Sequence, residues 1–534
     1  MRCKQVVCLL AFAVLSLMFL AACGNQESII PTVVLEDAIT KEALVAHAQA
    51  LEQISLNNPL SRSASSPGYT QAMDYIKNSL ENSGLTIWEQ RFDYRLFLET
   101  RDPVLSMISP SQQAYVWDTD YLTMTYCGFG DVTAEIVFVT PLLPPGGTNN
   151  ASTDGCEAAD FQGVDVSGKI AVIQRGTCNF LDKVSNAESR GAVAVLIFNE
   201  GQEGRTGITL GALPADSTVG IPVLGITYDL GKSLHDQYAA GAAITVRVAV
   251  TGKNAMTPTF NLFAETAAGR NDQVIMIGAH LDSVIEGPGI NDNGSGTAAL
   301  LEVARQIGLH GYTPQNKIRF AWWGAEEVGL IGSYHYLDNL STTDLRNIAM
   351  YLNVDSIASH NFIRGVEDTD LSDTKDYPGT LYENTPEGSG AIEQVLLDYF
   401  HAQNLPTQPT PITGGTDYAG FAKYGIPFGG LYTGLDGIKT EAEAVLFGGT
   451  AGLPYDSCYH KACDTLSNIN TQIFTENTRA IAHLVQYFGD RKVTTLFDKP
   501  AVSRSLRVVS AETAKPVTTH RDRYHKNRRD RPLR

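Results

Sequence analysis

From about residue 257 to residue 489, apolar runs of strand length alternate with segments whose apolar residues recur at helical spacing. The expected strands are residues 274–279, 317–323, 348–353 and 426–432. One expected helix begins after Ser295, and the others cover residues 330–340, 389–403 and 473–487. This alternation predicts an α/β fold in which helices cover both faces of a mostly parallel, mixed sheet. Ligands of such a sheet bind outside the carboxyl ends of its strands.

The first expected strand leads into a polar, glycine-rich turn, and this segment carries an imidazole and two carboxylates that are candidates for a metal site. His280 and Asp282 are two residues apart at the end of the strand, so both side chains can point to one side of it. Asp292 lies in the turn, just before the next helix. Imidazole nitrogen and carboxylate oxygen suit zinc, and a second carboxylate can orient the histidine from behind. Taken alone, the segment is equally compatible with a solvated turn that contains a histidine.

Later segments add polar residues at comparable positions. Glu326 and Glu327 follow the second strand, and one can bind a metal while the other faces the substrate, because adjacent side chains of an extended turn point apart. Asp355 follows the third strand, and His460 lies in a short loop bounded by two cysteines. Each residue also has an ordinary explanation. The glutamates could open a helix, Asp355 could cap one, and the histidine could lie on the surface.

The N-terminal half predicts two helices, an edge strand and an inserted module. Residues 40–57 and 68–83 show helical spacing, and residues 85–96 alternate as an edge strand would. From about residue 118, short apolar runs are separated by glycine, proline and asparagine, which predicts a strand-rich insert. Its expected strands are residues 135–139, 169–174, 193–199, 221–226 and 243–250.

The N-terminus predicts an exported chain. Arg2 and Lys4 precede an apolar run that ends Leu-Ala-Ala-Cys at Cys23, which resembles the lipoprotein box of bacteria. The resemblance implies a lipoprotein signal peptide over residues 1–22, lipid on the Cys23 thiol and a tether over residues 23–34. The mature chain would then be anchored to a membrane of the cell envelope, on its periplasmic or cell-surface face. If Cys23 is accidental, the segment is an ordinary signal peptide and the protein is secreted.

Charge and cysteines narrow the partners and the compartment. The formal net charge of -18 argues against nucleic acid as a partner, because phosphate binding needs a basic face. Outside the cytoplasm disulfides can form. Among the cysteines that remain after export, we expect Cys156 to pair with Cys178 and Cys458 with Cys463. Cys127 is left over, and the sequence does not decide its state, although it could be a buried free thiol.

Two sets of motifs resemble known families. Residues 168–180 (GKIAVIQRGTCNF) and 191–199 (GAVAVLIFN) closely resemble the protease-associated (PA) domain, which implies a β-rich lid or docking module without catalytic residues. Four motifs, in this order, resemble the M28 family of zinc aminopeptidases, in particular its secreted members with a PA insert: residues 274–296, 324–333, 353–355 and 456–465. The second resemblance covers nearly the whole mature chain and implies a zinc-peptidase fold with two Zn2+ ions.

The M28 resemblance implies a role for each candidate residue. The metal ligands would be His280 and Asp355 for one zinc ion, Glu327 and His460 for the other, and Asp292 as the bridge between them. The catalytic residues would be Glu326 as the general base, Asp282 as the residue that orients His280, and Tyr459 as a donor to the developing oxyanion. Five side chains with one bridge give three protein ligands for each metal, which leaves positions for water and substrate.

Two segments depart from the family pattern. Asp355 is followed by Ser356 where many relatives carry methionine, and residues 414–418 (GGTDY) stand where relatives often have an Arg-Ser-Asp-His run. The missing arginine concerns the grip on the substrate and the side-chain preference rather than the metals. Tyr432 and Phe421 are candidate walls of an apolar specificity pocket, although core packing would explain them as well.

We therefore expect an exported di-zinc aminopeptidase that removes N-terminal, apolar residues from peptides. The alternatives are a carboxypeptidase of the same fold, a single-zinc transferase resembling glutaminyl cyclases, and a non-catalytic surface receptor. No oligomeric state is predicted. The basic C-terminal tail, residues 491–534, is expected to be disordered. The alternative is that it contacts anionic lipid or a cell-surface polymer. The expected segments are the signal peptide (1–22), tether (23–34), N-terminal part of the peptidase domain (35–117), PA insert (118–255), catalytic domain (256–490) and tail (491–534).

Overall fold

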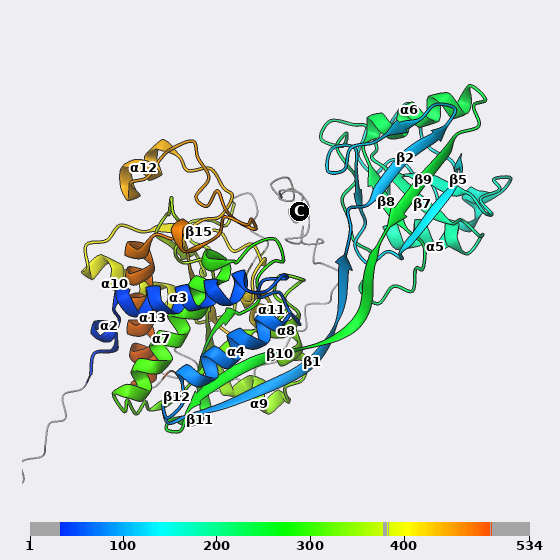
Figure 1. Ribbon diagram of the computed structural model, residues 1–534. Helices are drawn as coiled ribbons and strands as arrows, with labels where there is room; N and C mark the ends of the chain where they lie inside the picture. The colour runs from blue at the N-terminus through cyan, green and yellow to red at the C-terminus, as the bar shows by residue number, and fades with distance from the viewer. Residues whose placement is uncertain (1–32, 377–381, 383, 492, 494–534) are drawn as a thin grey trace, which may run out of the picture.

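A computed structural model describes residues 33–376, 382, 384–491 and 493. Figure 1 shows a larger lobe, which contains both ends of the described chain, and a smaller lobe that two long strands connect to it. The signal peptide, Cys23 and the tail from residue 494 lie outside the described residues. Over the described ranges, no helix is both long enough and apolar enough to cross a membrane.

The larger lobe contains an eight-stranded mixed sheet in the order β1-β10-β12-β11-β13-β16-β14-β15. Its strands are β1 (Leu85–Glu99), β10 (Gly252–Thr266), β11 (Arg270–His280), β12 (Asn316–Trp323), β13 (Ile348–Val354), β14 (Gly365–Glu367), β15 (Gln408–Thr410) and β16 (Phe428–Tyr432). The strands β12, β11, β13 and β16 run parallel in the middle, while β10 and β14 pair antiparallel with β12 and β16. The predicted α/β fold with a mostly parallel, mixed sheet is confirmed.

Alternate residues of the central strands face two different helical layers, as the two-residue period of a strand requires. On β11, Ile275 and Ile277 pack in one buried cluster and Met276 packs in another. The first cluster includes residues of α2 (Leu35–Ala38), α3 (Lys41–Leu56), α4 (Pro67–Ser79), α7 (Gly296–Leu309), α10 (Ser389–Ala402) and α13 (Thr471–Gly489). The second includes residues of α8 (Ile331–Asp338), α9 (Thr342–Asn347) and α11 (Tyr418–Lys423). The sheet is therefore buried on both faces, which explains its nearly continuous apolar strands.

The smaller lobe is built on a second eight-stranded sheet in the order β3-β2-β9-β5-β6-β7-β8-β4. Its strands are β2 (Val104–Ser109), β3 (Gln113–Ala114), β4 (Tyr121–Thr123), β5 (Gly130–Phe138), β6 (Ile170–Gln174), β7 (Ala194–Phe198), β8 (Val223–Ile226) and β9 (Thr245–Val250). The helices are α5 (Phe180–Glu188), α6 (Tyr228–Ala239) and the short turn η1 (Ala158–Phe161). The predicted disulfide between Cys156 and Cys178 is present. Cys127, whose state the sequence left open, is a buried free thiol.

Two features of the chain path differ in detail from the sequence-based expectation. The expected edge strand is longer, since β1 pairs with β10 over 15 residues, from Leu85 opposite Thr266 to Glu99 opposite Gly252. This pair forms the connection between the lobes (Figure 1). Residues 104–117 were assigned to the peptidase domain, but β2 pairs with β9 in the second sheet, because the chain enters and leaves the smaller lobe side by side.

Candidate active site

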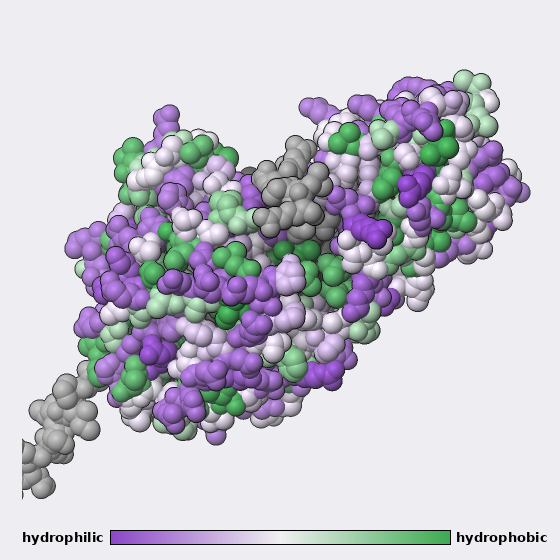
Figure 2. All heavy atoms as spheres, viewed as in Figure 1, coloured by the Kyte–Doolittle hydropathy of each residue, from purple (hydrophilic) through white to green (hydrophobic). Residues whose placement is uncertain are grey.

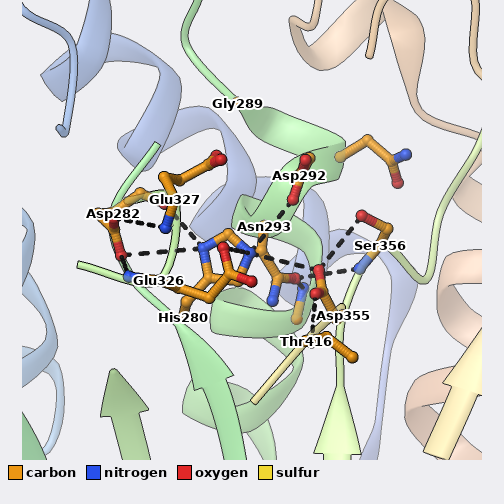
Figure 3. Close-up of polar contacts among 12 residues, drawn as sticks. His280, Asp282, Gly289, Asp292, Asn293, Glu326, Glu327, Asp355, Ser356 and Thr416 are labelled. Atoms are coloured by element: carbon orange, nitrogen blue, oxygen red, sulfur yellow. Dashed lines mark hydrogen bonds and ion pairs between the residues drawn. The ribbon is translucent and has the colours of Figure 1, made fainter. Parts of the chain in front are cut away.

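The candidate residues converge at the carboxyl ends of three central strands. His280 is the last residue of β11, Glu326 and Glu327 lie in the turn after β12, and Asp355 follows β13. Since β11 is the parallel neighbour of both other strands, the three ends meet at one edge of the sheet. Figure 3 shows the side chains of Asp292, Glu326 and Asp355 gathered around the imidazole of His280. This is the edge at which the sequence predicted a ligand site.

Asp292 lies between two histidines that come from distant parts of the chain. It belongs to the irregular turn η2 (Ile290–Ser295), and its Oδ1 and Oδ2 atoms lie 3.2 Å from Nε2 of His280 and 3.1 Å from Nε2 of His460. A second carboxylate faces each nitrogen. Asp355 Oδ1 is 3.4 Å from His280 Nε2, and Glu327 Oε2 is 3.2 Å from His460 Nε2. The five side chains form two groups of one imidazole and two carboxylates that share Asp292.

These two groups have the composition of metal sites. A single imidazole N–H donates one hydrogen bond, whereas three carboxylates face Nε2 of His280 and two face Nε2 of His460. A cation between the nitrogen and the two carboxylates would serve all three groups, and zinc accepts this mixture of donors. The ligand atoms of His280, Asp292 and Glu327 lie within 4.8 Å of one another, as do those of His280, Glu326 and Asp355. The residues present therefore fit a metal.

The cluster contains more carboxylate charge than its two histidines, His280 and His460, can balance. Its acidic residues are Asp282, Asp292, Glu326, Glu327 and Asp355. Burial raises the pKa of Glu326 well above its usual range and, with the adjacent charge of Glu327, raises that of Asp282 to about 7. Burial lowers the pKa of His460, but Glu327 and Asp292 outweigh it and raise the value to about 10. Such crowding of like charges is what a bound cation relieves.

Asp282 contacts the site in a different way from the one expected. His280 Nδ1 lies 3.0 Å from the backbone carbonyl oxygen of Asp282, while the nearest carboxylate oxygen of Asp282 is 3.9 Å away. The carboxylate instead accepts hydrogen bonds from the backbone amides of Glu326, at 3.1 Å, and Glu327, at 3.2 Å. Asp282 therefore orients the histidine through its carbonyl group and holds both glutamates through its side chain.

Arg62 supports the loop behind the candidate metal ligands, and sequence reasoning missed it. Its fully buried guanidinium donates to the carbonyl oxygens of Leu281 at 3.2 Å and Gly289 at 3.0 Å, and to that of Pro288. It also donates to Ser55 in α3 at 2.8 Å. The arginine thus ties the loop between β11 and η2 to the N-terminal helices. No sequence signal distinguishes it from a surface arginine, because it stands alone in a polar segment between two helices.

A buried network of polar side chains fixes the backbone at Asp292. Asp464 accepts the backbone amides of Asn291 at 2.9 Å and Asp292 at 3.1 Å. The Asn291 side chain donates to Asp456 at 2.7 Å, and Asn468 donates to both Asp456 and Asp464. The acids that flank His460 in the motif at residues 456–465 were visible in the sequence but were given no role. The predicted disulfide between Cys458 and Cys463 closes the same loop.

The segment that lacks the family arginine contacts Asp355. The Thr416 hydroxyl donates to Asp355 Oδ2 at 2.7 Å, and Ser356, at the other departure from the family pattern, donates to Asp355 Oδ1 at 3.3 Å. Asn353 donates in turn to Thr416 at 3.1 Å. Burial raises the pKa of the neighbouring Asp417 to about 7. These side chains restrain the carboxylate of Asp355.

Three aromatic residues have different surroundings. Tyr459 is buried and stacks on His460, with 3.9 Å between the ring centroids. Burial raises the pKa of Tyr459 well above its usual range. Phe421 is fully buried and stacks on Tyr351 at 3.6 Å, so core packing, and not a specificity pocket, accounts for it. Tyr432 ends β16 and is half-buried.

Comparison with known proteins agrees with this geometry. Peptidase family M28 matches residues 261–485, and the PA domain matches residues 132–234. An aminopeptidase of Pseudomonas aeruginosa is 40% identical over 472 residues, which span 87% of this chain and 85% of that protein. The protein named "Probable lipoprotein aminopeptidase LpqL" of Mycobacterium tuberculosis is 36% identical over 467 residues and 86% of each chain.

The structure is also similar to a solved aminopeptidase from Aneurinibacillus sp. strain AM-1. The TM-score is 0.63 at 25% identity, and the similarity covers 86% of this chain and 96% of that one. The similarity to the sequence relatives and to this solved aminopeptidase extends over both lobes, and not over the catalytic lobe alone. The chain therefore belongs to peptidase family M28 and is a metallopeptidase of the aminopeptidase type whose catalytic domain carries an inserted PA domain.

Proposed function

We propose that the protein is an exported di-zinc aminopeptidase that removes N-terminal, apolar residues from peptides. Membership of family M28 supports hydrolysis of a peptide bond. The names of the relatives from Pseudomonas aeruginosa and Mycobacterium tuberculosis support action at the amino end of the substrate. The placement of Asp292 between two histidines is the observation that carries the number of metals.

The two groups of side chains correspond to two metal sites. The proposed ligands are His280 and Asp355 for one zinc ion, Glu327 and His460 for the other, and Asp292 for both. A single-zinc site would need only one of the two imidazoles and would leave the second carboxylate oxygen of Asp292 without a function. Zinc ions held by these residues would polarise the carbonyl group of the scissile bond and make a water molecule more acidic.

Glu326 is the proposed general base. Its Oε2 atom lies 3.8 Å from Nε2 of His280, the longest of the three carboxylate contacts to that nitrogen, so it stands beside the ligands. Its carboxylate would accept a proton from the attacking water and pass it to the leaving amine. Tyr459 would donate to the oxyanion that develops on the substrate. Asp282 would hold Glu326 in place through the backbone amide.

One set of assays separates this proposal from its alternatives. Purified protein is analysed for zinc and is given three substrates: leucine anilide, an N-blocked peptide with a free carboxyl end, and a peptide with N-terminal glutamine. We expect two zinc ions per chain and release of leucine. Cleavage only from the carboxyl end would identify a carboxypeptidase. One zinc ion per chain with cyclisation of the glutamine would identify a glutaminyl cyclase-like transferase. Metal without any of these activities would favour a receptor.

We also propose that lipid on Cys23 anchors the exported chain. The Leu-Ala-Ala-Cys sequence supports this, as does the name of the Mycobacterium tuberculosis relative. The test is metabolic labelling with a fatty acid in a bacterial host, with Cys23→Ser as the control. Label in the wild type alone supports the anchor, whereas an unlabelled wild type found in the medium means that the protein is secreted. The smaller lobe would serve as a lid or docking module for peptides.

A further inference from the structure

A cavity of about 390 Å³ lies outside the catalytic cluster, between α12 (Glu441–Phe447), the segment before β14 and the start of α13. None of its lining residues is a proposed metal ligand or catalytic residue. Figure 1 shows α12 projecting at the top of the larger lobe, near β15. A volume of this size is in the range of sites for small organic ligands.

Two buried cations line this cavity. Lys439 is 1% exposed and Arg364 is 4% exposed. The Lys439 ammonium donates to the carbonyl oxygens of Phe362 at 2.6 Å and Asn361 at 3.4 Å, and it makes no ion pair with a described residue. A buried ammonium without a carboxylate partner is costly, because its charge has left water. Among the described residues, no carboxylate therefore lies within ion-pair distance of the Lys439 ammonium.

Arg364 has one partner of opposite charge and one unused donor. Its Nη2 atom donates to Glu476, and its Nη1 atom donates to the carbonyl oxygen of Pro406 at 2.9 Å. The Nε atom has no hydrogen-bond acceptor among the described residues. The other nearby acid, Glu443, accepts hydrogen bonds from Thr440, Tyr455 and Gln408. The charge of Glu443 acts on Lys439 from a distance, but neither carboxylate forms an ion pair with the lysine.

The first turn of α13 adds to the positive potential of the cavity. Asn470 and Gln472 line it, and the Asn470 side chain caps the helix by accepting the amides of Gln472 and Ile473. The N-terminus of a 19-residue helix carries a partial positive charge. The helix end and the two buried cations therefore both favour an anion in the cavity.

The rest of the lining is mixed, because His360, Asn470 and Gln472 contribute polar atoms and four apolar side chains lie beside them. Phe362, Leu405, Leu446 and Phe447 line the cavity together with the cations, and Lys439 lies over the Phe362 ring at 5.6 Å from its centroid. A small inorganic anion would lose hydrating water next to the apolar side chains and would gain no polar contact from them in exchange. A carboxylate that carries an apolar group satisfies both the cations and the walls, because the charged end and the apolar end are then each matched.

We propose that the cavity under α12 binds an organic carboxylate with an apolar side chain, such as a free apolar amino acid or the carboxyl end of a peptide presents. The carboxylate would lie near the ammonium of Lys439 and the guanidinium group of Arg364, and the apolar group would lie against Phe362 and Leu446. The site is independent of the proposed catalytic residues and binds without any chemical change in the ligand.

Calorimetric titration of the zinc-loaded enzyme tests the site with ligands that have a blocked amine. The ligands are N-acetyl-leucine, an N-acetylated tetrapeptide ending in leucine, N-acetyl-leucinamide and inorganic phosphate. We expect saturable binding of at least one of the two carboxylates and none of the amide, which lacks the charge. The stronger of the two carboxylates identifies the source of the ligand. Equal binding of the amide, binding of phosphate with the same affinity, or no saturable binding of either carboxylate would overturn the proposal.

A matched pair of variants on α12 separates this cavity from binding at the metals. Leu446 lines the cavity, whereas its neighbour Val445 is 89% exposed and does not. Figure 2 shows apolar surface on the projecting segment around α12. Leu446→Asp should raise the Kd by about tenfold or more, since a like charge then faces the ligand, and Val445→Asp should leave it unchanged. Both variants should hydrolyse peptides as the wild type does. Equal loss of binding in both variants, or in neither, would contradict the site.

Discussion

Replacing each of the adjacent glutamates with glutamine tests whether they have different roles. Glu327 Oε2 is 3.2 Å from His460 Nε2, whereas Glu326 Oε2 is 3.8 Å from His280 Nε2. Asp282 holds the backbone amides of both residues at almost the same distance, 3.1 and 3.2 Å. Neither change touches these backbone bonds, so the two variants are matched in fold and differ only in the side chain that is altered.

The expected magnitudes follow from what each side chain contacts. Glu326→Gln removes the proposed proton acceptor and should lower kcat by about two orders of magnitude or more, or about 2.7 kcal/mol of transition-state stabilisation, with a smaller effect on KM. Glu327→Gln replaces a proposed ligand with a neutral amide, which binds zinc less tightly. Its activity should return in part when zinc is added in excess, while that of Glu326→Gln should not.

Zinc content after dialysis and the steady-state hydrolysis of leucine anilide, with and without added zinc, distinguish the variants. We expect Glu326→Gln to retain two zinc ions and Glu327→Gln to retain fewer. The ligand atoms of Glu326, His280 and Asp355 also lie within 4.8 Å of one another. If Glu326→Gln loses zinc and Glu327→Gln keeps both ions, the roles are reversed. If neither variant loses activity, this cluster is not the active site.

Three further predictions follow from other contacts. Thr416→Val removes the 2.7 Å hydrogen bond to Asp355 and should weaken zinc binding by about tenfold to a hundredfold; an unchanged zinc titration would contradict this. Serine at both cysteines of the 458–463 disulfide should lower the free energy of unfolding by about 2 kcal/mol, as thermal unfolding would show. Burial raises the pKa of Asp154 from 3.8 to about 6, so the folded state binds more protons and its stability falls by about 3 kcal/mol as the pH rises through that window. Asp154→Asn should flatten this pH dependence, and an unaltered slope would refute it.

The parts of the fold that depend on local pattern were predictable from the sequence. The strands of the catalytic lobe are buried on both faces, so their apolar runs are nearly continuous and stand out from the helices between them. The assignment of residues 104–117 to the peptidase domain did not anticipate that β2 pairs with β9, about 140 residues later in the chain. Pairing at that distance is decided by the tertiary fold, and a short strand does not reveal its partner.

In the site, too, residues within local motifs were predictable, and residues that act through distant contacts were not. His280, Asp292 and His460 stand in motifs that carry metal-ligand residue types, so the sequence indicated them. Arg62 and Thr416 act through contacts with residues 219 and 61 positions away, and only the fold brings them there. The carbonyl contact of Asp282 could not be predicted either, because backbone atoms have no sequence signal. Phe421 shows the reverse case, since an apolar residue near a site motif is more often part of the core.

The central claim is that two metal ions lie on either side of Asp292. It is tested most directly by diffraction from crystals of the zinc-loaded protein, measured on both sides of the zinc absorption edge. We expect two anomalous peaks about 3.5–4 Å apart, one beside His280 and Asp355 and the other beside His460 and Glu327, with one oxygen of Asp292 directed at each. A single peak at saturating zinc, or two peaks that Asp292 does not join, would contradict it.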